Sequence, residues 1–543
     1  MNRGAFIIVT MIVCLVVAGG GLAHAAPAVR LDCNKTLAPG STLMLTDKRD
    51  LSGKMPCADN CTNDPYPCAI VGPDPAGPAA TVHVPPNDCV LIAQGEVTIS
   101  GRVRFVVGHK NRAFDCCRDG EGHGSVLCSY SNLTIARGAV VTLETTDDDV
   151  VVNPGGFWTG EWITVHGTVN ASLKMHAGGK GQMTGVNGLL SSSGIRVGAT
   201  GAVIASGQNV ARGAAVQGGG HGTVVDGSVT CSAYNVSDAG GCLAAGNNFT
   251  LGPAGRIAAS DAFSVGGAGG VLDCGSNVAV LQGRVVADRI RSPNDAGAVL
   301  TGNGVVMLGD ARIVGTDIYA GGGPAVVTAT NFTMRGNARL EARNTWGGDG
   351  GAVEVTRARF HDNSSVFCEN AYADSFGACV AGDIALDGTA SIVARNMTGK
   401  ALGGALGGGY PRQNLSVTGA ATVLVEGSTA GMYGGAIIAN TITIGGTAKV
   451  TLRDTSAACG GAINTLDDGM QIGQGKLVID GTGGAALLIE DARELNATLG
   501  CRSVMAHMAE AQPCSGCAAK PSEACACANA KAGAAFTECC NSS

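Results

Sequence analysis

Three short segments of the chain carry residue types that could catalyse a hydrolytic reaction. They are the acidic run with Asp147 and Asp148, His221 between two glycines, and Arg291 at the end of an Arg-Ile-Arg triplet. Two carboxyl groups can act as acid and base in glycoside hydrolysis when they face one bond from about 5 to 10 Å apart. Imidazole and guanidinium groups can move a proton or stabilise negative charge. These four residues are the candidate catalytic residues.

Patterns for other chemistry are sparse. The segment Gly347-Gly348-Asp349-Gly350 resembles half of a calcium-binding nonapeptide and occurs once. No G-x-S-x-G signature of a serine hydrolase is present. We therefore expect no cofactor, with an isolated structural calcium ion as the one metal site to consider.

The composition indicates which elements must position these residues. Of 543 residues 85 are Gly, 45% are hydrophobic, and only 4% are aromatic and 15% charged. The glycines have no three-residue period, which excludes collagen, and a mean hydropathy of +0.21 excludes wholesale disorder. A core built from Val, Ile, Leu and Ala suits a stack of thin, similar layers, which is typical of a β-solenoid.

A repeat of about 27 residues supports this interpretation. A glycine, a small residue and an aliphatic residue recur at intervals of 26 to 31 residues between Gly241 and Gly461, and two further aliphatic positions follow in each repeat. The first file is Leu243, Leu272, Val299, Val326, Val353, Val380, Leu406, Ile437 and Ile463. The second is Leu251, Val280, Met307, Met334, Phe360, Leu386, Val417, Ile444 and Ile472. The third is Ile257, Val285, Ile313, Leu340, Val366, Ile392, Val423, Val450 and Leu477.

Each file predicts a short strand that is stable only when it pairs with the equivalent strand of the next repeat. Stacking at about 4.8 Å per coil gives a parallel β-helix with three strands in each coil. The segment 156–490 has room for about 12 coils, and an extra loop at 407–412 lies between the first and second strands of one coil. With this period, the acidic run, His221 and Arg291 lie about 70 residues and two to three coils apart. That is on the order of 10 to 14 Å along the rod, which argues against a shared active site.

The N-terminal 25 residues predict a secretory signal peptide. Arg3 precedes an apolar run, and Ala23-His24-Ala25 forms a cleavage site, while the glycines at 19–21 shorten the run below the length of a membrane span. We expect an extracellular protein, secreted or on the cell surface, without a transmembrane segment after the signal. The formal charge of −7, without basic clusters in the sequence, argues against nucleic acid as a partner.

Sequons and cysteines fit an oxidising, glycosylating compartment. Cys231 and Cys242 are eleven residues apart, as are Cys368 and Cys379, and each second cysteine has the same place in the repeat, so we predict two disulfides. Twelve N-x-[ST] sites are glycosylation candidates, although Asn is also common in β-turns. They are Asn34, Asn60, Asn132, Asn170, Asn235, Asn248, Asn331, Asn363, Asn396, Asn414, Asn496 and Asn541.

The segments that flank the repeats differ in composition. Residues 26–155 contain eight Cys and many Pro, and we predict a Cys-rich N-terminal cap there. Residues 491–543 contain seven Cys and no strand pattern, and they predict a small Cys-rich module.

Gly-Gly-Ala followed by Ile, Leu or Val at 350–353, 403–406, 434–437 and 460–463, together with Phe360-His361-Asp362-Asn363, resembles the GGA[ILV] and FxxN repeats of chlamydial polymorphic outer-membrane proteins. More broadly, the chain is similar to the pectin-lyase-like family of right-handed β-helices. This resemblance implies a right-handed parallel β-helix and a surface-exposed, adhesive role. FxxN occurs once, however, and no C-terminal membrane barrel follows.

From these observations we expect a structural or adhesive rod, more likely without enzymatic activity, whose partner is a carbohydrate or another cell-surface or matrix component. Three Trp residues are too few for a long stacking platform, and Trp158 and Trp162 are expected to be buried at the cap junction. Because the same fold carries enzymes, a polysaccharide lyase or glycoside hydrolase is the alternative.

Overall fold

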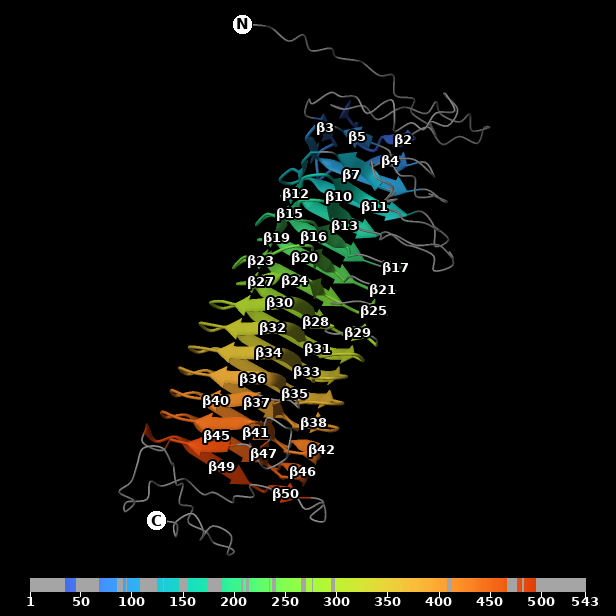
Figure 1. The fold of residues 1–543 in the computed structure, drawn as a ribbon. Coiled ribbons are helices and arrows are strands. Elements are labelled where there is room, and N and C mark those ends of the chain that lie inside the picture. Colours follow the sequence, from blue (N-terminus) through green and yellow to red (C-terminus); the bar gives the residue numbers. More distant parts are fainter. Residues whose placement is uncertain are drawn as a thin grey trace, which may run out of the picture.

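The computed structural model describes residues 35–44, 68–84 and most of 91–494. Within the last range it leaves out 94, 108–124, 130, 146–154, 173–187, 207–208, 211–213, 234, 237–240, 265–269, 276, 294–297, 408–412, 466–475 and 481–482. The described residues form parallel β-strands joined by turns, without an α-helix. They stack into one elongated solenoid (Figure 1). The predicted parallel β-helix is confirmed; the signal peptide and nearly all of the C-terminal module lie outside the described residues.

Each complete coil contributes four strands to the solenoid. In one coil these are β22 (Leu243–Ala245), β23 (Phe249–Leu251), β24 (Arg256–Ser260) and β25 (Phe263–Ser264). The first two belong to one sheet, here the first sheet, and the last two to a second sheet. The sequence predicted three strands in each coil, and the short fourth strand was missed because it is only two residues long in this coil.

In the middle of the solenoid, neighbouring strands of one coil merge into longer ones. The first-sheet strands there are β30 (Leu300–Met307), β32 (Val327–Met334), β34 (Val353–Phe360) and β36 (Val380–Leu386). The second-sheet strands are β31 (Arg312–Ala320), β33 (Arg339–Gly347) and β35 (Ser365–Ala373). Val353 and Phe360 therefore lie at the two ends of one strand, and Val366 lies on the opposite sheet; the exposure of all three is 1% or less.

The ladders agree with the predicted number of coils. The second strand of each coil forms a ladder of twelve parallel strands from β12 (Trp162–Val165) to β48 (Lys476–Ile479), so the chain makes about 11 turns between them. The same ladder continues N-terminally through β9 (Leu133–Ile135), β6 (Val97–Ser100), β3 (Cys68–Val71) and β1 (Lys35–Thr36).

The described parts of 35–145 therefore carry strands of the same solenoid, and residue 155 does not mark a break in the pairing. Long segments between strands, such as 108–124 and 146–154, lengthen the coils in this part of the chain. They obscure the 27-residue period, which is why the sequence suggested a separate cap.

The three aliphatic files line the interior, with small shifts from the predicted positions. Leu300, Val327 and Leu281 stack in the ladders instead of their predicted neighbours Val299, Val326 and Val280. Where two aliphatic residues are adjacent, spacing alone does not determine which one faces inward. In the last coil Ile479 and Leu487 take the places predicted for Ile472 and Leu477, because the segment 466–475 lengthens that coil. Ile472 itself lies outside the described residues.

Glycine pairs permit tight turns between successive coils. Gly434 has a φ of +63°, which favours glycine, and a Cβ on the next residue, Gly435, would lie 1.9 Å from the carbonyl oxygen of Gly461. The corner inside the second sheet uses asparagine instead. Asn344, Asn370 and Asn396 have φ between 52° and 55°, and each amide donates a hydrogen bond to the preceding coil, at 3.0 Å from Asn370 and 3.1 Å from Asn396.

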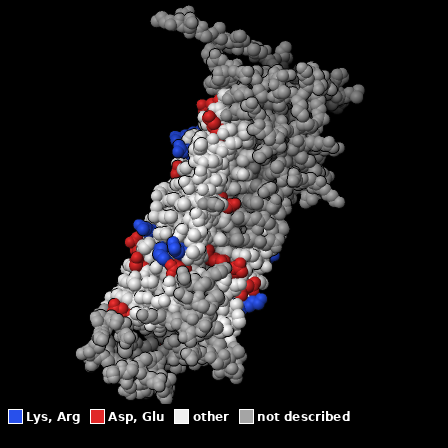
Figure 2. Space-filling view, viewed as in Figure 1, with Lys and Arg blue, Asp and Glu red and all other residues white. Residues whose placement is uncertain are grey.

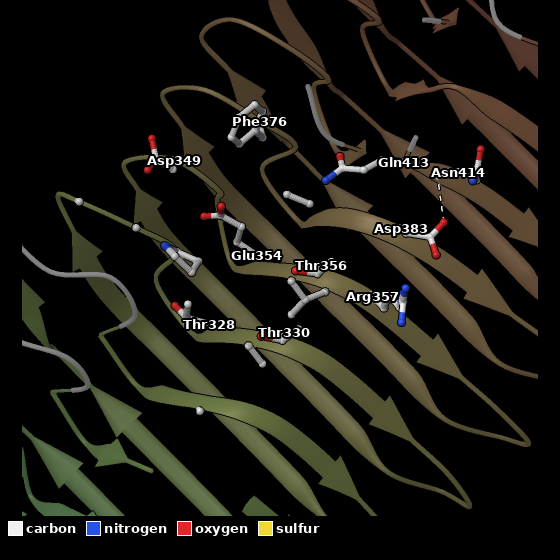
Figure 3. Close-up of a pocket in the computed structure, with 17 residues that line it drawn as sticks. Thr328, Thr330, Asp349, Glu354, Thr356, Arg357, Phe376, Asp383, Gln413 and Asn414 are labelled. Carbon is white, nitrogen blue, oxygen red and sulfur yellow. Dashed lines mark hydrogen bonds between the residues drawn. The ribbon is translucent and has the colours of Figure 1, made fainter. Parts of the chain in front are cut away.

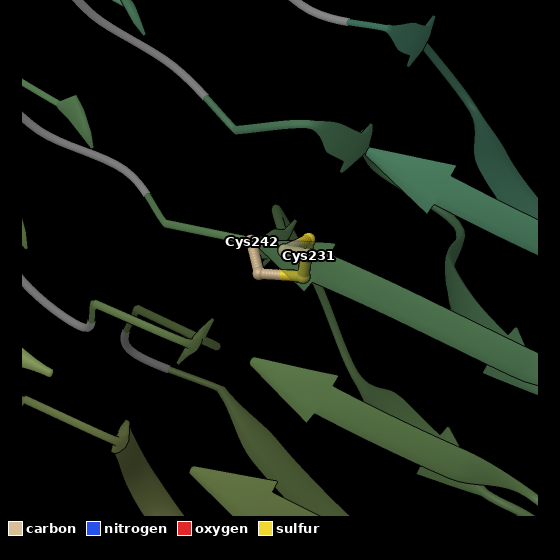
Figure 4. Close-up of a disulfide and its surroundings, with 2 residues drawn as sticks. All are labelled: Cys231 and Cys242. Carbon is tan, nitrogen blue, oxygen red and sulfur yellow. A yellow bond between two sulfur atoms is a disulfide. The ribbon is translucent and has the colours of Figure 1, made fainter. Parts of the chain in front are cut away.

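Two disulfides cross the interior at equivalent places in the repeat. Cys231 bonds to Cys242 (Figure 4), and Cys368 bonds to Cys379, with Cα–Cα distances of 5.8 and 5.6 Å. In each pair the first cysteine points inward from the second sheet, and the second one immediately precedes a first-sheet strand. Both predicted pairs are confirmed. Among the described cysteines Cys274 is free and buried, and burial raises the pKa of its thiol.

Candidate functional site

The structure does not bring the predicted catalytic residues together. Asp147 and Asp148 lie outside the described residues. His221 is exposed in the turn before β19 (Gly222–Val225) of the first sheet, whereas Arg291 begins β29 (Arg291–Ser292) of the second sheet, two coils further on. These two side chains leave the solenoid from different faces, so they cannot act on one bond.

A groove on the outer face of the first sheet is the strongest candidate site in the described part of the chain. It has a volume of about 760 Å³ and crosses β30, β32, β34 and β36 (Figure 3). Turn residues, among them Asp349 and Phe376, lie on one side, while Arg357, Asp383 and Asn414 lie on the other. Because it crosses several coils, the groove runs along the rod.

Small residues and a bulge shape the floor of the groove. Gly302, Ala329 and Val355 stack there on successive coils, and their short side chains leave space above the sheet. On the next strand the register shifts between Glu354 and Arg357, and Gly382 has a φ of +140° at this point. Such bulges redirect side chains and are common beside functional sites.

Glu354 projects into the middle of the groove (Figure 3). Burial, reinforced by the negative charge of Asp349, raises the pKa of the Glu354 carboxyl to about 7, although the backbone N–H of Gly350 partly offsets the shift. A carboxyl group with this pKa can donate a proton near neutral pH. It can also donate a hydrogen bond to a ligand oxygen.

Asp383 lies on the opposite side of the groove and is held from two directions. The guanidinium of Arg359 donates to Oδ2 of Asp383 at 2.7 Å, and the backbone N–H of Asn414 donates to Oδ1 at 3.2 Å. Neighbouring Arg357 is exposed and forms no ion pair with the described residues. The groove thus combines a carboxyl group that is protonated near neutral pH with a fixed acidic group and a free cation.

Two buried polar atoms in the groove lack a hydrogen-bond partner among the described residues. They are the hydroxyl Oγ1 of Thr328 and the side-chain oxygen Oε1 of Gln413. A buried polar atom without a partner costs roughly 1–3 kcal/mol, which a polar ligand can recover by hydrogen bonding. Both atoms therefore favour a ligand rich in hydroxyl groups over an apolar one.

A second surface feature is a row of three aromatic rings on the outer side of the second sheet. Tyr319, Trp346 and Tyr372 stack on successive coils with 4.9 Å between ring centroids, and Trp346 is 43% exposed. Counting Trp residues alone missed this row, because two of its members are tyrosines. Trp158 and Trp162 are half-buried and were not buried as expected.

Eight of the twelve candidate sequons fall on described residues, and they differ in environment. Asn248, Asn331, Asn363 and Asn396 are exposed. The amides of Asn363 and Asn396 also donate hydrogen bonds to asparagines of the preceding coil, so both have a structural role. Asn132 accepts a hydrogen bond from the backbone of Trp162. Asn34, Asn60, Asn496 and Asn541 lie outside the described residues.

Within the described ranges no three His, Cys, Asp or Glu side chains are clustered so that they could hold a metal ion. The same ranges contain no helix long and apolar enough to cross a membrane. No family model, curated protein or solved structure matches the chain.

Sequence reasoning missed the groove, whose side chains come from positions 302–414. One signal was available, since Glu354 and Asp383 follow the first aliphatic position of neighbouring repeats by one and three residues. Carboxylates at nearby places in successive repeats indicate one face of the rod.

Proposed function

We propose that this protein is a secreted or cell-surface rod that binds an extended carbohydrate in the groove of the first sheet. The observation that carries the proposal is the pair of unpartnered buried oxygens, Thr328 Oγ1 and Gln413 Oε1, in a groove that runs across four coils. Sugar hydroxyls can donate hydrogen bonds to both atoms, and the groove adds Glu354, Asp383 and Arg357 as further polar groups.

The shape of the groove supports a polymer over a compact ligand. The site lies open along the rod and follows its axis, so an oligosaccharide can place successive sugar units on successive coils. Phe376 and Pro324 add apolar surface at one side, against which the C–H face of a sugar ring can pack.

Isothermal titration of the purified chain with a panel of neutral and acidic oligosaccharides tests this proposal. Thr328→Val removes the hydroxyl at nearly constant volume, and we expect it to weaken binding by about tenfold without lowering stability, because the lost hydroxyl has no partner in the free protein. Thr345→Val is the matched control, since Thr345 is also buried with an unpartnered hydroxyl but lies outside the groove. Failure of every saccharide to bind, or equal losses in both variants, would contradict the proposal.

Hydrolysis or lyase cleavage of the bound polysaccharide is a second candidate function, favoured by the raised pKa of Glu354. Glu354 pairs with Ala381 on the next coil, so Asp383 lies two residues further along that strand, and strand geometry places the two acidic Cα atoms roughly 8 Å apart. Paired carboxyl groups in hydrolases work at comparable separations. Reducing-end assays on the same panel test this function. Glu354→Gln should abolish turnover and retain binding, and the absence of turnover in the unmodified chain would leave the rod as a binding protein.

A further inference from the structure

Four arginines form a straight column on the outer face of the second sheet. Arg256, Arg284, Arg312 and Arg339 occupy the first position of β24, β28 (Arg284–Asp288), β31 and β33, and they are paired in register from coil to coil. At a rung spacing of about 4.8 Å the column is roughly 14 Å long and follows the rod axis. It is separate from the groove, to which none of its members contributes.

Most of the positive charge in the arginine column is not neutralised by the protein. Arg312 donates to Glu341 at 2.6 Å, whereas Arg256, Arg284 and Arg339 are exposed and form no ion pair with the described part of the chain. The nearby Asp310 accepts a hydrogen bond from Asn337. Like charges directly opposite each other on paired strands are unfavourable. In a chain with a net charge of −7, such a column calls for an external counter-charge.

Other charged side chains of the second sheet behave differently. At the far end of the same strands, Arg343, Arg395 and Arg453 each face a glutamate on the following coil. On the face shown in Figure 2, most of the described surface is uncharged, and positive and negative side chains lie close together. The unpaired arginine column is therefore an exception to the way this protein arranges charge.

The surface beside the arginine column suits a sugar polymer. Ala258, Val286 and Val314 form a half-buried apolar file two residues along the same strands. Sugar rings can pack their C–H faces on this file while their acidic groups face the arginines. A single extended chain can keep its charges along a straight column, whereas the phosphates of duplex DNA wind away from it.

We propose that the arginine column and its apolar file bind an anionic polysaccharide, such as a sulfated or uronic-acid glycan, along the axis of the rod. This site is independent of the groove and takes a more specific class of ligand. It also changes the expectation from the sequence, which contains no basic cluster because these arginines are 27 or 28 residues apart. The fold assembles the cluster.

The test is titration of the full chain with dextran sulfate, with uncharged dextran and a short DNA duplex as comparisons. Arg256→Ser, Arg284→Ser and Arg339→Ser in one chain should weaken dextran sulfate binding about fivefold for each arginine removed. Serine fits this file, because Ser228, Ser365 and Ser391 occupy it in neighbouring coils. Added salt should weaken binding to the unmodified chain.

The matched control is the triple variant Arg343→Ser, Arg395→Ser and Arg453→Ser, which removes the same charge from the opposite end of the strands and should bind nearly as well as the unmodified chain. Glu341→Gln should strengthen binding about fivefold because it frees Arg312. Equal losses in the two triple variants, or binding of DNA but not of dextran sulfate, would overturn the proposal. Thr328→Val should leave dextran sulfate binding unchanged, which separates this site from the groove.

Discussion

Arg343 and Glu369 lie opposite each other on adjacent coils, and Nη1 of Arg343 donates a hydrogen bond to Oε2 of Glu369 over 2.8 Å. The same outward file continues with alternating charge through the next four coils, as Arg395, Glu426, Arg453 and Glu490. A coil shifted by a whole repeat would place like charges together. The alternating file therefore favours the observed register, in addition to its modest direct contribution to stability.

Reversing one charge in this file should destabilise the solenoid. Glu369→Arg places three arginines on successive coils, and we expect a loss of about 1 kcal/mol at low salt. Thermal unfolding followed by circular dichroism measures the change. Glu369→Gln should lose less, and high salt should reduce the difference between the two variants, because both side chains are partly exposed. A difference that salt does not affect would exclude charge repulsion as its cause.

A methyl group at Gly435 should be poorly tolerated. The Cβ of Gly435→Ala would lie 1.9 Å from the carbonyl oxygen of Gly461, so the coils must separate locally, at a cost of about 1–3 kcal/mol. Gly445→Ala is a matched control, since the nearest atom to its Cβ is 3.8 Å away and belongs to the side chain of Thr418. Melting temperatures of the two variants should differ clearly, and equal values would argue against close approach of the coils at Gly435.

The disulfide between Cys368 and Cys379 should stabilise the turn that contributes to the groove. It closes a segment that contains Phe376, one of the groove residues. Removing both cysteines as Cys368→Ala and Cys379→Ala should cost about 2–3 kcal/mol and weaken saccharide binding. Non-reducing peptide mapping should first detect the linked peptides. The double variant Cys231→Ala and Cys242→Ala removes an equivalent disulfide far from the groove and should lower stability without changing binding.

Stability should depend on pH through Glu354. Burial and Asp349 raise the pKa of this carboxyl to about 7 in the folded chain, from 4.5 for an ordinary glutamate. Between these values the folded chain holds a proton that the unfolded chain releases, so stability is greatest below about pH 4.5 and falls as the pH rises to 7, by up to about 3 kcal/mol. Melting temperatures at several pH values should show this slope in the unmodified chain and a smaller one in Glu354→Gln. An identical slope in both would refute the assignment.

Much of the fold followed from the sequence because a solenoid is nearly one-dimensional. Each coil contacts only its neighbours, so a period of about 27 residues determines which strands pair. Val353, Phe360 and Val366 were correctly predicted as inward residues, and both disulfides followed from the equivalent places of their cysteines. Errors arose where two aliphatic residues are adjacent, as at Val299 and Leu300, or where a long segment lengthens a coil, as before Leu477.

The sites depended on the tertiary structure. Spacing along the chain separated His221 from Arg291, but it could not show that Glu354, Asp383 and Gln413 border one groove, because a bulge and a turn place them there. Arg256, Arg284 and Arg339 are isolated in the sequence and adjacent in space. Amino-acid type and period determine which residues face outward, whereas the stacking of coils determines which outward residues meet.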